Sequence, residues 1–414
     1  MVSTKNIVIL GGSYGGVSSA HYILKHVLPA LPTTTPFRVI LISTSSEVLC
    51  RPACPRAMIS DELLPQTKLF VSIPDAFAQY PAEYFSFEHG TAVRLDHTDR
   101  TISVKSSDGR TEKRIDFFAL VIATGASTPS PLFGLSHDSE FLRKKWAAFR
   151  EGLVTAKSIV IAGGGPAGVE TAGELGEYLN GQAGWFSYKM ENPRVHITLV
   201  TSSSQILPIL RPSIAQKAES YLACIGVTVI KNTKVTDVTP GNAGTANALT
   251  TNTMVILADG KSIQADVYIP TTGTTPNTTF IDESLLDPEG RVHTNASTLR
   301  VEKAGPRVYA IGDASSYARP AIHNIMSAIP VLCANIKRDI LLDVKVAETS
   351  VAVDRIFQED MRETQLVPIG TSKGVGAAMG YQLPSFLVWL IKGRDYWLWT
   401  TGKLWNGDQW AKEA

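Results

Sequence analysis

Short apolar runs rich in β-branched residues recur along this chain, and two of them lead directly into glycine-rich turns. The run at 6–10 precedes the turn GGSYGG at 11–16, and the run at 158–162 precedes GGGPAG at 163–168. After each turn the pattern becomes that of a helix, and a further apolar run follows the helix. Each stretch therefore predicts a strand, a tight turn, a helix and a second strand.

Glycine turns of this kind, placed between a strand and a helix, bind phosphate groups. The first N–H groups of a helix have no partner inside the helix, and the helix dipole favours negative charge there. The second turn has glycine at all three positions of the G-x-G-x-x-G pattern, whereas Ser13 replaces the middle glycine of the first and narrows the space for a pyrophosphate. Two such units in one chain are hard to obtain by chance. The candidate phosphate-binding residues are Gly11, Gly12, Ser13, Tyr14, Gly15 and Gly16 in the first unit and Gly163, Gly165 and Gly168 in the second.

Three further apolar runs end in small or polar residues that suit a ligand site. The run at 118–123 is followed by Thr124 and Gly125, small residues that let the backbone approach a bound group. The segment 267–277, after the second unit, likewise has an apolar run followed by small and polar residues. A third run delivers Asp313 at the edge where open α/β sheets bind ligands. An aspartate there is often only a helix cap, but the two phosphate-binding turns favour a binding role.

Composition limits the class of protein. A chain of 414 residues exceeds one ordinary core and predicts two or three domains, and 44% hydrophobic with 19% charged residues is typical of a globular protein. Because nucleic-acid binding relies on an excess of Lys and Arg that neutralise phosphates, the net charge of +1 predicts no nucleic-acid partner. The four cysteines form no C-x-x-C pair and the eight histidines no metal-ligand pattern, so we expect no metal site. With no secretory signal and no apolar run near the ~20 residues of a membrane helix, we expect a soluble cytoplasmic protein.

The motifs GGSYGG, ATG, GGGPAGVE, TGTTPN and AIGDAS occur in an order that resembles the flavoproteins with two dinucleotide-binding domains. Within them the chain most resembles the apoptosis-inducing-factor-like group that includes the ferroptosis-suppressor quinone reductases, with type II NADH dehydrogenases as more distant relatives. The resemblance implies a tightly held FAD in the first unit and a transient NADH or NADPH in the second. It also implies an α/β fold with two Rossmann-like domains, for FAD and NAD(P), and a small α+β C-terminal domain. We place the FAD-binding domain at 1–130 and 290–345, the NAD(P)-binding domain at 131–289 and the C-terminal domain at 346–414.

Several single residues acquire roles in this setting. Arg56 matches a family arginine that contacts FAD, with a solvated loop arginine as the alternative, and Ala92 lies where the family makes a main-chain contact to adenine. We expect Asp313 to bond the ribityl chain of the flavin. Lys392 matches a family lysine that approaches the flavin, with a snorkelling surface lysine as the alternative. Glu170 follows the second turn, and its alternative is a carboxylate that the helix dipole favours. Lys392 and Glu170 are the candidate catalytic residues.

The chain departs from the usual pattern at the ends of the two second strands, where a carboxylate normally bonds the ribose hydroxyls. Ser43 stands there in the first unit, with Glu47 as the nearest carboxylate, and the second unit has only TSSS at 201–204. Because no carboxylate repels a 2′-phosphate there, we expect use of both NADH and NADPH. Arg211 is near enough in sequence to reach such a phosphate, and a solvated arginine is the alternative.

Two cysteines, Cys50 and Cys54, lie in the segment that runs beside the flavin in this family. Their spacing differs from that of the family's redox pairs, and two prolines stiffen the loop. We therefore favour small apolar thiols that line the cofactor pocket over a dithiol relay.

The C-terminal region is unusually aromatic. Amphipathic rings suit a surface with one apolar and one wet side. Plain packing, a homodimer interface, a membrane contact and the roof of a hydrophobic substrate pocket are all open interpretations, and without a polybasic cluster a peripheral membrane contact would be weak. The tryptophans concerned are Trp389, Trp397, Trp399, Trp405 and Trp410.

The expected activity is FAD-dependent transfer of a hydride from NAD(P)H, followed by transfer of two electrons to a quinone-like or other hydrophobic small-molecule acceptor. One alternative is an oxidase or monooxygenase that tailors a hydrophobic small molecule in specialised metabolism, which the departures at Ser13 and Ser43 favour. Another is a nucleotide-sensing interaction protein of the apoptosis-inducing type, whose DNA-binding basicity a chain of net charge +1 lacks.

Overall fold

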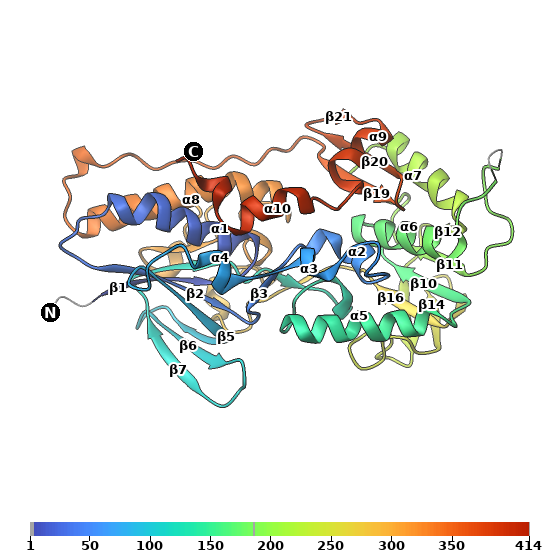
Figure 1. Ribbon diagram of the computed structural model, residues 1–414, viewed down its shortest axis with the longest axis horizontal. Coiled ribbons are helices and arrows are strands. Elements are labelled where there is room, and N and C mark those ends of the chain that lie inside the picture. Colours follow the sequence, from blue (N-terminus) through green and yellow to red (C-terminus); the bar gives the residue numbers. More distant parts are fainter. Residues whose placement is uncertain (1–3, 185–186, 414) are drawn as a thin grey trace.

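A seven-stranded sheet forms one half of the molecule, at the left of Figure 1. The structure, a computed structural model, describes residues 4–184 and 187–413. In spatial order the strands are β18 (Val308–Ala310), β8 (Ala119–Ile122), β1 (Lys5–Leu10), β2 (Phe37–Ser43), β5 (Phe85–Asp96), β6 (Thr101–Ser106) and β7 (Glu112–Asp116). The strands from β18 to β5 run parallel, and β5, β6 and β7 pair antiparallel.

Both faces of this sheet are buried around β1, as is usual for parallel strands. Ile7 belongs to a core that includes helices α1 (Tyr14–Tyr22) and α8 (Ile322–Asp343). Val8 points to the opposite face and packs with residues of β6. The continuous apolar run at 6–10 is therefore explained by burial on both sides.

A second, smaller parallel sheet forms the other half of the molecule. Its strands, in spatial order, are β12 (Val227–Ile230), β11 (His196–Val200), β10 (Ser158–Ala162) and β16 (Val267–Pro270). One face packs against the helices α5 (Ser139–Leu153), α6 (Pro166–Asn180) and α7 (Pro212–Cys224). The other face packs against an antiparallel sheet of β13 (Val235–Thr239), β14 (Thr253–Leu257) and β15 (Ser262–Ala265).

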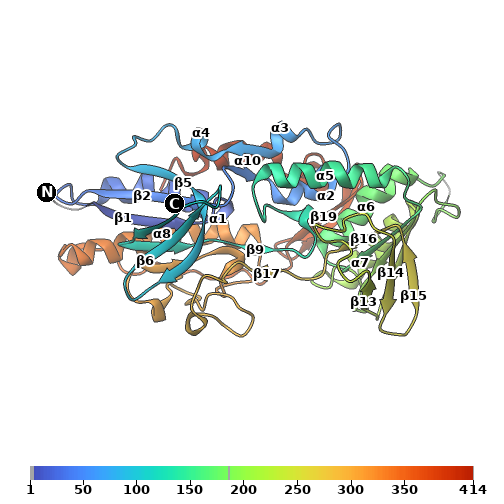
Figure 2. The same ribbon diagram turned by 90° about the horizontal axis from the view of Figure 1, so that it is seen from below.

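Short elements connect the two halves. Strands β9 (Ala126–Ser127) and β17 (Thr275–Pro276) pair antiparallel, and Figure 2 shows them between the two main sheets. The remaining elements of this region are β3 (Glu47–Leu49), β4 (Phe70–Ser72), α2 (Cys54–Ala57), α3 (Gln66–Leu69) and α4 (Ile73–Phe77).

The C-terminal part begins with a long connection that passes along the top of Figure 1, from α8 towards the second half. Ion pairs fasten it, such as Arg300 with Asp354 at 2.7 Å and Arg319 with Glu359 at 2.6 Å. The elements that follow are β19 (Gln365–Ile369), β20 (Lys373–Ala378), β21 (Tyr381–Gln382), α9 (Ser385–Val388), a π-helical turn (Trp389–Gly393) and α10 (Leu398–Trp405).

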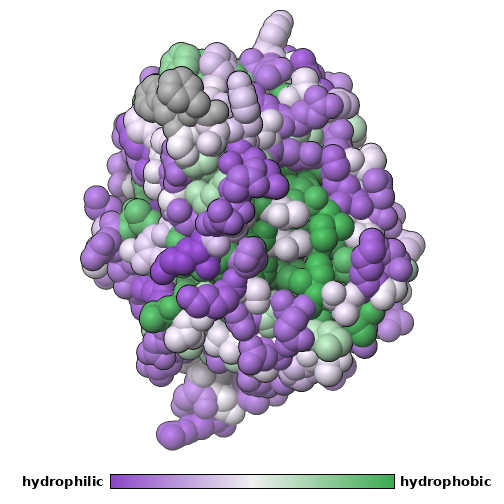
Figure 3. Space-filling model, turned by 90° about the vertical axis from the view of Figure 1, so that its right-hand side faces the viewer, coloured by the Kyte–Doolittle hydropathy of each residue, from purple (hydrophilic) through white to green (hydrophobic). Residues whose placement is uncertain are grey.

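This architecture confirms the predicted α/β fold class with two Rossmann-like units and a small α+β C-terminal part. Strand β18 follows the whole second unit in sequence but returns to the first sheet, which supports a discontinuous first domain; the boundaries stay predictions. No helix within the described residues has the length and apolar character needed to span a membrane. Figure 3 looks onto the end that carries α7 and β12, where apolar surface gathers in one region among hydrophilic residues.

Candidate functional site

The two glycine turns have the same local geometry. Gly11 and Gly163 have φ values of +112° and +119°, a region that is readily open only to glycine. A side chain on Gly16 would overlap the carbonyl oxygen of Gly11, and one on Gly168 would overlap that of Gly163. Each helix therefore starts closely packed on its turn, with its N-terminal N–H groups at the edge of the sheet.

The middle position of the pattern differs between the two turns without disturbing the backbone. Ser13 is exposed and extended, with φ −127°, directly before α1. Gly165 holds the matching place before α6, and no atom lies within 4 Å of the point where its Cβ would stand. The first turn thus accepts a serine, whose side chain occupies space that the second turn leaves open.

A hydroxyl group stands at the end of the second strand in both units. Ser43 packs so closely on Gly12 that a Cβ there would come within 2.5 Å of its Oγ. Thr201 packs on Gly164 in the same way, at 2.7 Å from its Oγ1. The sequence placed Ser43 where a ribose-binding carboxylate is usual, and the structure puts its hydroxyl directly beside the turn.

The two charged residues considered near the ribose positions have protein partners. Glu47 accepts hydrogen bonds from Ser139 and from Arg143, whose Nη1 lies 2.7 Å from Oε2. Burial alone would raise the pKa of Glu47, but these bonds lower it. Arg211 directly precedes α7 and pairs with Glu363 at 2.6 Å, so its guanidinium is already engaged.

The motifs ATG and TGTTPN contact each other. Thr124 Oγ1 donates to the carbonyl oxygen of Asn277 at 2.8 Å, and the Asn277 side-chain amide donates to that of Thr124 at 2.9 Å. The Asn277 backbone N–H donates to Gly125 at 3.0 Å. The sequence predicted Thr124 and Gly125 as parts of a cofactor site, and the structure also makes them the link between the two halves.

The roles predicted for Asp313, at the ribityl chain, and for Ala92, at the adenine, stay predictions. Asp313 follows β18, at the edge where Ile311 lies against Gly15 of the first turn. Its carboxylate is 3.7 Å from Arg51 Nη1 and remains partly exposed. Ala92 lies on β5 and is half-buried.

The structure brings the two candidate catalytic residues together. Lys392 Nζ lies 2.5 Å from Glu170 Oε1, and it also donates to the carbonyl oxygen of Leu366 at 3.0 Å. Both side chains are buried. Burial raises the pKa of Glu170 to about 7, although the ammonium group of Lys392 lowers it. This carboxyl group can therefore gain or lose a proton near neutral pH.

Arg56 is buried and has protein partners on all sides. Its Nε and Nη2 donate to the two carboxylate oxygens of Glu174 at 2.9 and 2.8 Å. Nη1 donates to the carbonyl oxygens of Gly393 and Arg394 at 2.7 and 3.3 Å, and Nη2 also to Gly370 at 3.0 Å. These bonds use all five N–H groups of a guanidinium. The predicted contact of Arg56 with FAD stays a prediction, and the structure shows a different set of partners.

The two central cysteines are buried and free. Tyr14 O–H of the first turn donates to Cys50 Sγ at 3.7 Å, and Cys50 S–H donates to the carbonyl oxygen of Tyr396 at 3.4 Å. Burial raises the pKa of Cys50 to about 11 and that of Cys54 to about 12. Both groups are therefore thiols at neutral pH, which supports a packing role because exchange reactions need the thiolate.

The aromatic residues near the C-terminus divide into two groups. Trp405 and Trp410 are buried, and the ring of Trp405 meets that of Tyr14 with centroids 4.8 Å apart. Trp399 and Phe386 are 59% and 65% exposed. Trp389 and Trp397 are half-buried. Plain packing accounts for the buried residues, and the interface, membrane and pocket interpretations stay open for the others.

Sequence reasoning gave no role to Glu174, Tyr396 or Asn277. Glu174 had a usable signal, because it lies four residues after Glu170 and therefore shares one face of α6 with it. Asn277 belongs to the TGTTPN motif, but neither its partner Thr124 nor the partner Glu174 of Tyr396 could be read from the sequence, since they lie 153 and 222 positions away.

Comparison with known proteins shows which family this is. A family model described as pyridine nucleotide-disulphide oxidoreductase matches residues 5–331. The chain belongs to this family. It is 63% identical over 410 residues to oxidoreductase phnG of Penicillium herquei, covering 99% of this chain and 98% of that protein. It is 31% identical to oxidoreductase ptaL of Pestalotiopsis fici over 94% of this chain and 95% of the relative.

More distant similarities agree with the resemblance found in the sequence. Ferroptosis suppressor protein 1 of Taeniopygia guttata is 25% identical over 94% of this chain and 92% of its own. Among solved structures, the sulfide:quinone oxidoreductase of Aquifex aeolicus matches with a TM-score of 0.67 at 14% identity, covering 97% of this chain and 92% of that one. That match shows a shared fold.

FAD and NAD(P)H are the cofactors of this protein family. The residues present fit two dinucleotides. Both turns have the positive φ and the close helix packing that bring backbone N–H groups to a pyrophosphate. The first would hold FAD and the second the nicotinamide cofactor.

Proposed function

We propose that this oxidoreductase transfers electrons from NADH or NADPH, through bound FAD, to a quinone-like or other hydrophobic acceptor. The observation that carries the proposal is the buried Lys392–Glu170 pair next to two matching dinucleotide turns. Glu170 lies two residues after Gly168 of the second turn. Tyr14 of the first turn reaches the same region through Cys50.

The chain's own residues bind, orient and supply protons. Bound FAD would accept a hydride from the nicotinamide and release two electrons to the acceptor. Lys392 Nζ offers positive charge where negative charge develops during reduction. Lys392 can donate an ammonium proton to a reduced acceptor, and Glu170, with a pKa of about 7, can then return a proton to the amine.

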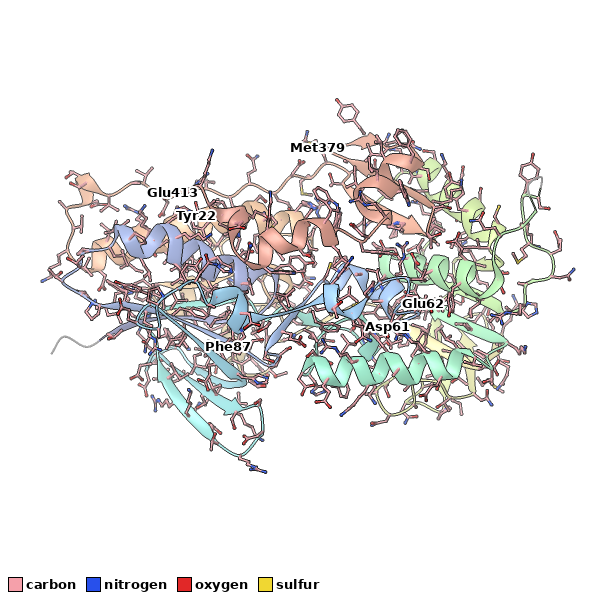
Figure 4. All side chains as sticks on the ribbon, viewed as in Figure 1. Tyr22, Asp61, Glu62, Phe87, Met379 and Glu413 are labelled. Carbon is pink, nitrogen blue, oxygen red and sulfur yellow. The ribbon has the colours of Figure 1, made fainter. Side chains whose placement is uncertain are left out.

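Two observations support a hydrophobic acceptor. The relatives include proteins named ferroptosis suppressor protein 1, and a fold neighbour is named sulfide:quinone oxidoreductase. The C-terminal part also exposes apolar side chains, among them Met379 at the outer edge of the turn between β20 and β21 in Figure 4. This surface suits entry of a lipophilic molecule, a weak peripheral membrane contact or a homodimer interface.

The second turn supports use of both nicotinamide cofactors. Thr201 takes the place of a ribose-binding carboxylate, so nothing there repels a 2′-phosphate. Arg211 is held by Glu363, so nothing among these residues selects for that phosphate either.

The test is spectroscopic. The purified protein should be yellow, with a flavin spectrum that bleaches on anaerobic addition of NADH or of NADPH and returns on addition of a short-chain quinone. A colourless protein that takes up no FAD and leaves both reduced nicotinamides unchanged would overturn the proposal.

An oxidase or monooxygenase acting on a hydrophobic small molecule is the second candidate. The relatives that share most sequence in the comparison above are named only as oxidoreductases, which leaves the acceptor open. If reduced protein consumes oxygen rapidly and a quinone does not compete, this candidate replaces the quinone reductase. The third alternative, a nucleotide-sensing interaction protein, predicts a protein that binds nucleotides without turnover.

A further inference from the structure

A second buried ion pair lies one helical turn along α6 from the Lys392–Glu170 pair. Glu170 and Glu174 are four residues apart, so they share one face of the helix. Lys392 binds the first carboxylate from the C-terminal part, and Arg56 binds the second from α2. None of these four side chains is more than 8% exposed. Two carboxyl groups and two cations thus form one buried cluster.

Arg56 also fixes the backbone that carries Lys392. Its Nη1 donates to the carbonyl oxygens of Gly393 and Arg394, the two residues that follow Lys392. The same guanidinium holds Glu174 with two parallel bonds. Arg56 therefore sets the distance between helix α6 and the segment from which Lys392 reaches Glu170.

Tyr396 connects the two ion pairs. Its O–H donates to Glu174 Oε1 at 2.9 Å. Arg56 lies over its ring at 4.8 Å and Lys392 at 5.7 Å from the ring centroid. A displacement of Arg56 would therefore be felt at both carboxylates.

The cluster is also coupled electrostatically. Burial raises the pKa of Glu170, the charge of Lys392 lowers it, the charge of Glu174 raises it and that of Arg56 lowers it. Tyr396 faces the two carboxylates and stays protonated, because burial holds its pKa well above 10. These titratable and charged groups surround Glu170. Glu177, one turn further along α6 than Glu174, also acts on the cluster, because its charge raises the pKa of Arg56.

We propose that Arg56 is a positioning residue, which sets the geometry and the protonation of the Lys392–Glu170 pair through Glu174 and the backbone at 393–394. It is not a ligand of FAD. The inference rests on the proposed function, because a role of that pair in the reaction is part of it.

The charge of Arg56 and its hydrogen bonds have separable effects. Without the charge, two buried carboxylates share the single cation Lys392, and the cluster takes up a proton at higher pH. Without Glu174, the remaining carboxylate faces two cations and keeps its charge to lower pH. Lysine in place of Arg56 keeps the charge but has three donors on a flexible stem instead of a rigid fork of five.

The experiment compares Arg56→Met, Arg56→Lys, Glu174→Gln and the double variant Arg56→Met/Glu174→Gln. For each, the FAD-to-protein ratio, the thermal unfolding midpoint against pH and the pH dependence of anaerobic flavin reduction by NADH are measured. We expect the apparent pKa of the cluster, taken from the pH dependence of flavin reduction and of unfolding, to rise by about one unit or more in Arg56→Met. In Glu174→Gln the same pKa should fall. The double variant should return towards the wild type. Arg56→Lys should keep the wild-type pKa with slower reduction and a lower unfolding midpoint.

Arg150→Lys is the matched control. Arg150 binds the carbonyl oxygens of Ala57 and Met58 at the end of α2 and pairs with Asp61, which Figure 4 labels beside that helix. It contacts neither carboxylate of the cluster, so its variant should keep the wild-type pH profile.

The proposal is overturned if the Arg56 variants purify without flavin and show wild-type pH dependence once FAD is added back, since that is the behaviour of a lost cofactor ligand. If Arg56→Met does not fold, the pH profiles of Arg56→Lys and Glu174→Gln decide between the two roles of Arg56.

If Lys392→Met leaves flavin reduction unchanged, the proposed function of the Lys392–Glu170 pair fails instead. The pH dependence of unfolding still tests the Arg56 inference in that case, because it requires no turnover: the loss of stability as pH rises should be displaced to higher pH in Arg56→Met.

Discussion

Among the individual residues, Glu170 and Lys392 have the surroundings most relevant to a reaction. Each is an ordinary surface residue type, and each is buried here against the other. Because the pKa of Glu170 is raised to about 7, the folded protein holds a proton that the unfolded chain has lost. Its contribution to stability is therefore present at acidic pH and is lost as pH rises from the ordinary range of glutamate through about 7.

Replacing Lys392 tests the residue-scale interpretation. Lys392→Met keeps most of the length of the side chain but removes the ammonium group that would stabilise negative charge during reduction. We expect the anaerobic rate of flavin bleaching by NADH to fall by about two orders of magnitude, the size of effect seen when one electrostatic donor is removed from an active site. Rapid mixing with absorbance detection measures that rate.

Lys373→Met provides the comparison, because Lys373 is an exposed lysine on β20 in the same C-terminal part of the chain. Its variant should bleach at the wild-type rate. Equal rates in wild type and Lys392→Met, at equal FAD content, would exclude a role for this ammonium group in the first half of the reaction.

At the scale of elements, the two strand–turn–helix units share their geometry but differ in how open they are. Gly11 and Gly163 adopt nearly the same backbone, and Gly16 and Gly168 make the same close approach. The difference lies in the middle position, where Ser13 adds a side chain. The first turn therefore leaves less space at this position than the second.

The variant Gly168→Ala should distinguish the cofactor bound by the second turn from the one bound by the first. Its Cβ would overlap the carbonyl oxygen of Gly163, so the second turn must open and lose its fit to a pyrophosphate. We expect the KM for NADH and for NADPH to rise at least about tenfold, which corresponds to ~1.4 kcal/mol of lost binding, while the FAD content stays at the wild-type level. Steady-state kinetics and the visible spectrum give both values.

Two further variants complete this test. Gly16→Ala should show the reverse pattern, with loss of FAD. Gly402→Ala, in α10 with no atom near the added Cβ, should leave both cofactors unaffected. Loss of FAD in Gly168→Ala, with unchanged KM values, would contradict the assignment of the second turn to NAD(P)H.

At the scale of the whole molecule, the C-terminal segment returns across the structure and closes against the first helix. His21 of α1 accepts from Tyr80 O–H at 2.9 Å and donates from Nε2 to the carbonyl oxygen of Trp405 at 2.8 Å. Lys25 and His26 bond the carbonyl oxygens of Gly407 and Trp410. The end of the chain thus holds the first unit to the part that supplies Lys392.

Acid should weaken this closure. Burial lowers the pKa of His21 to about 4, so the folded protein keeps it neutral where an unfolded chain protonates it. The resulting stability is complete above about pH 6.5 and is lost as pH falls towards 4, by up to about 3 kcal/mol. We expect the unfolding midpoint to drop more steeply over this range in the wild type than in His21→Gln, as measured by differential scanning fluorimetry.

The exposed His196 serves as the reference site, since His196→Gln should keep the wild-type slope. A His21→Gln variant with the same pH slope as the wild type would show that this residue does not couple the C-terminal closure to protonation.

Local pattern was sufficient for the parts of the site that are continuous in sequence. The turns at 11–16 and 163–168 could be recognised because glycine at fixed spacing has one dominant structural cause. Glu170 belongs to the GGGPAGVE motif, whereas only the family resemblance points to Lys392. Their pairing, however, joins positions 222 residues apart, and no local signal encodes such a contact. Arg56 shows the same limit, because the five acceptors that surround it come from other parts of the chain.

By itself, the sequence determined the α/β class, the two dinucleotide-binding turns and the chemistry that they support, because strand periodicity and glycine spacing act within a few residues. Only the tertiary structure decided that Thr124 and Asn277 join the two halves, that Arg56 turns to Glu174, and that Lys392 meets Glu170 away from water. These contacts depend on how distant segments pack. Burial then sets the charges, since a carboxylate or an ammonium group removed from water must find its partner in the protein.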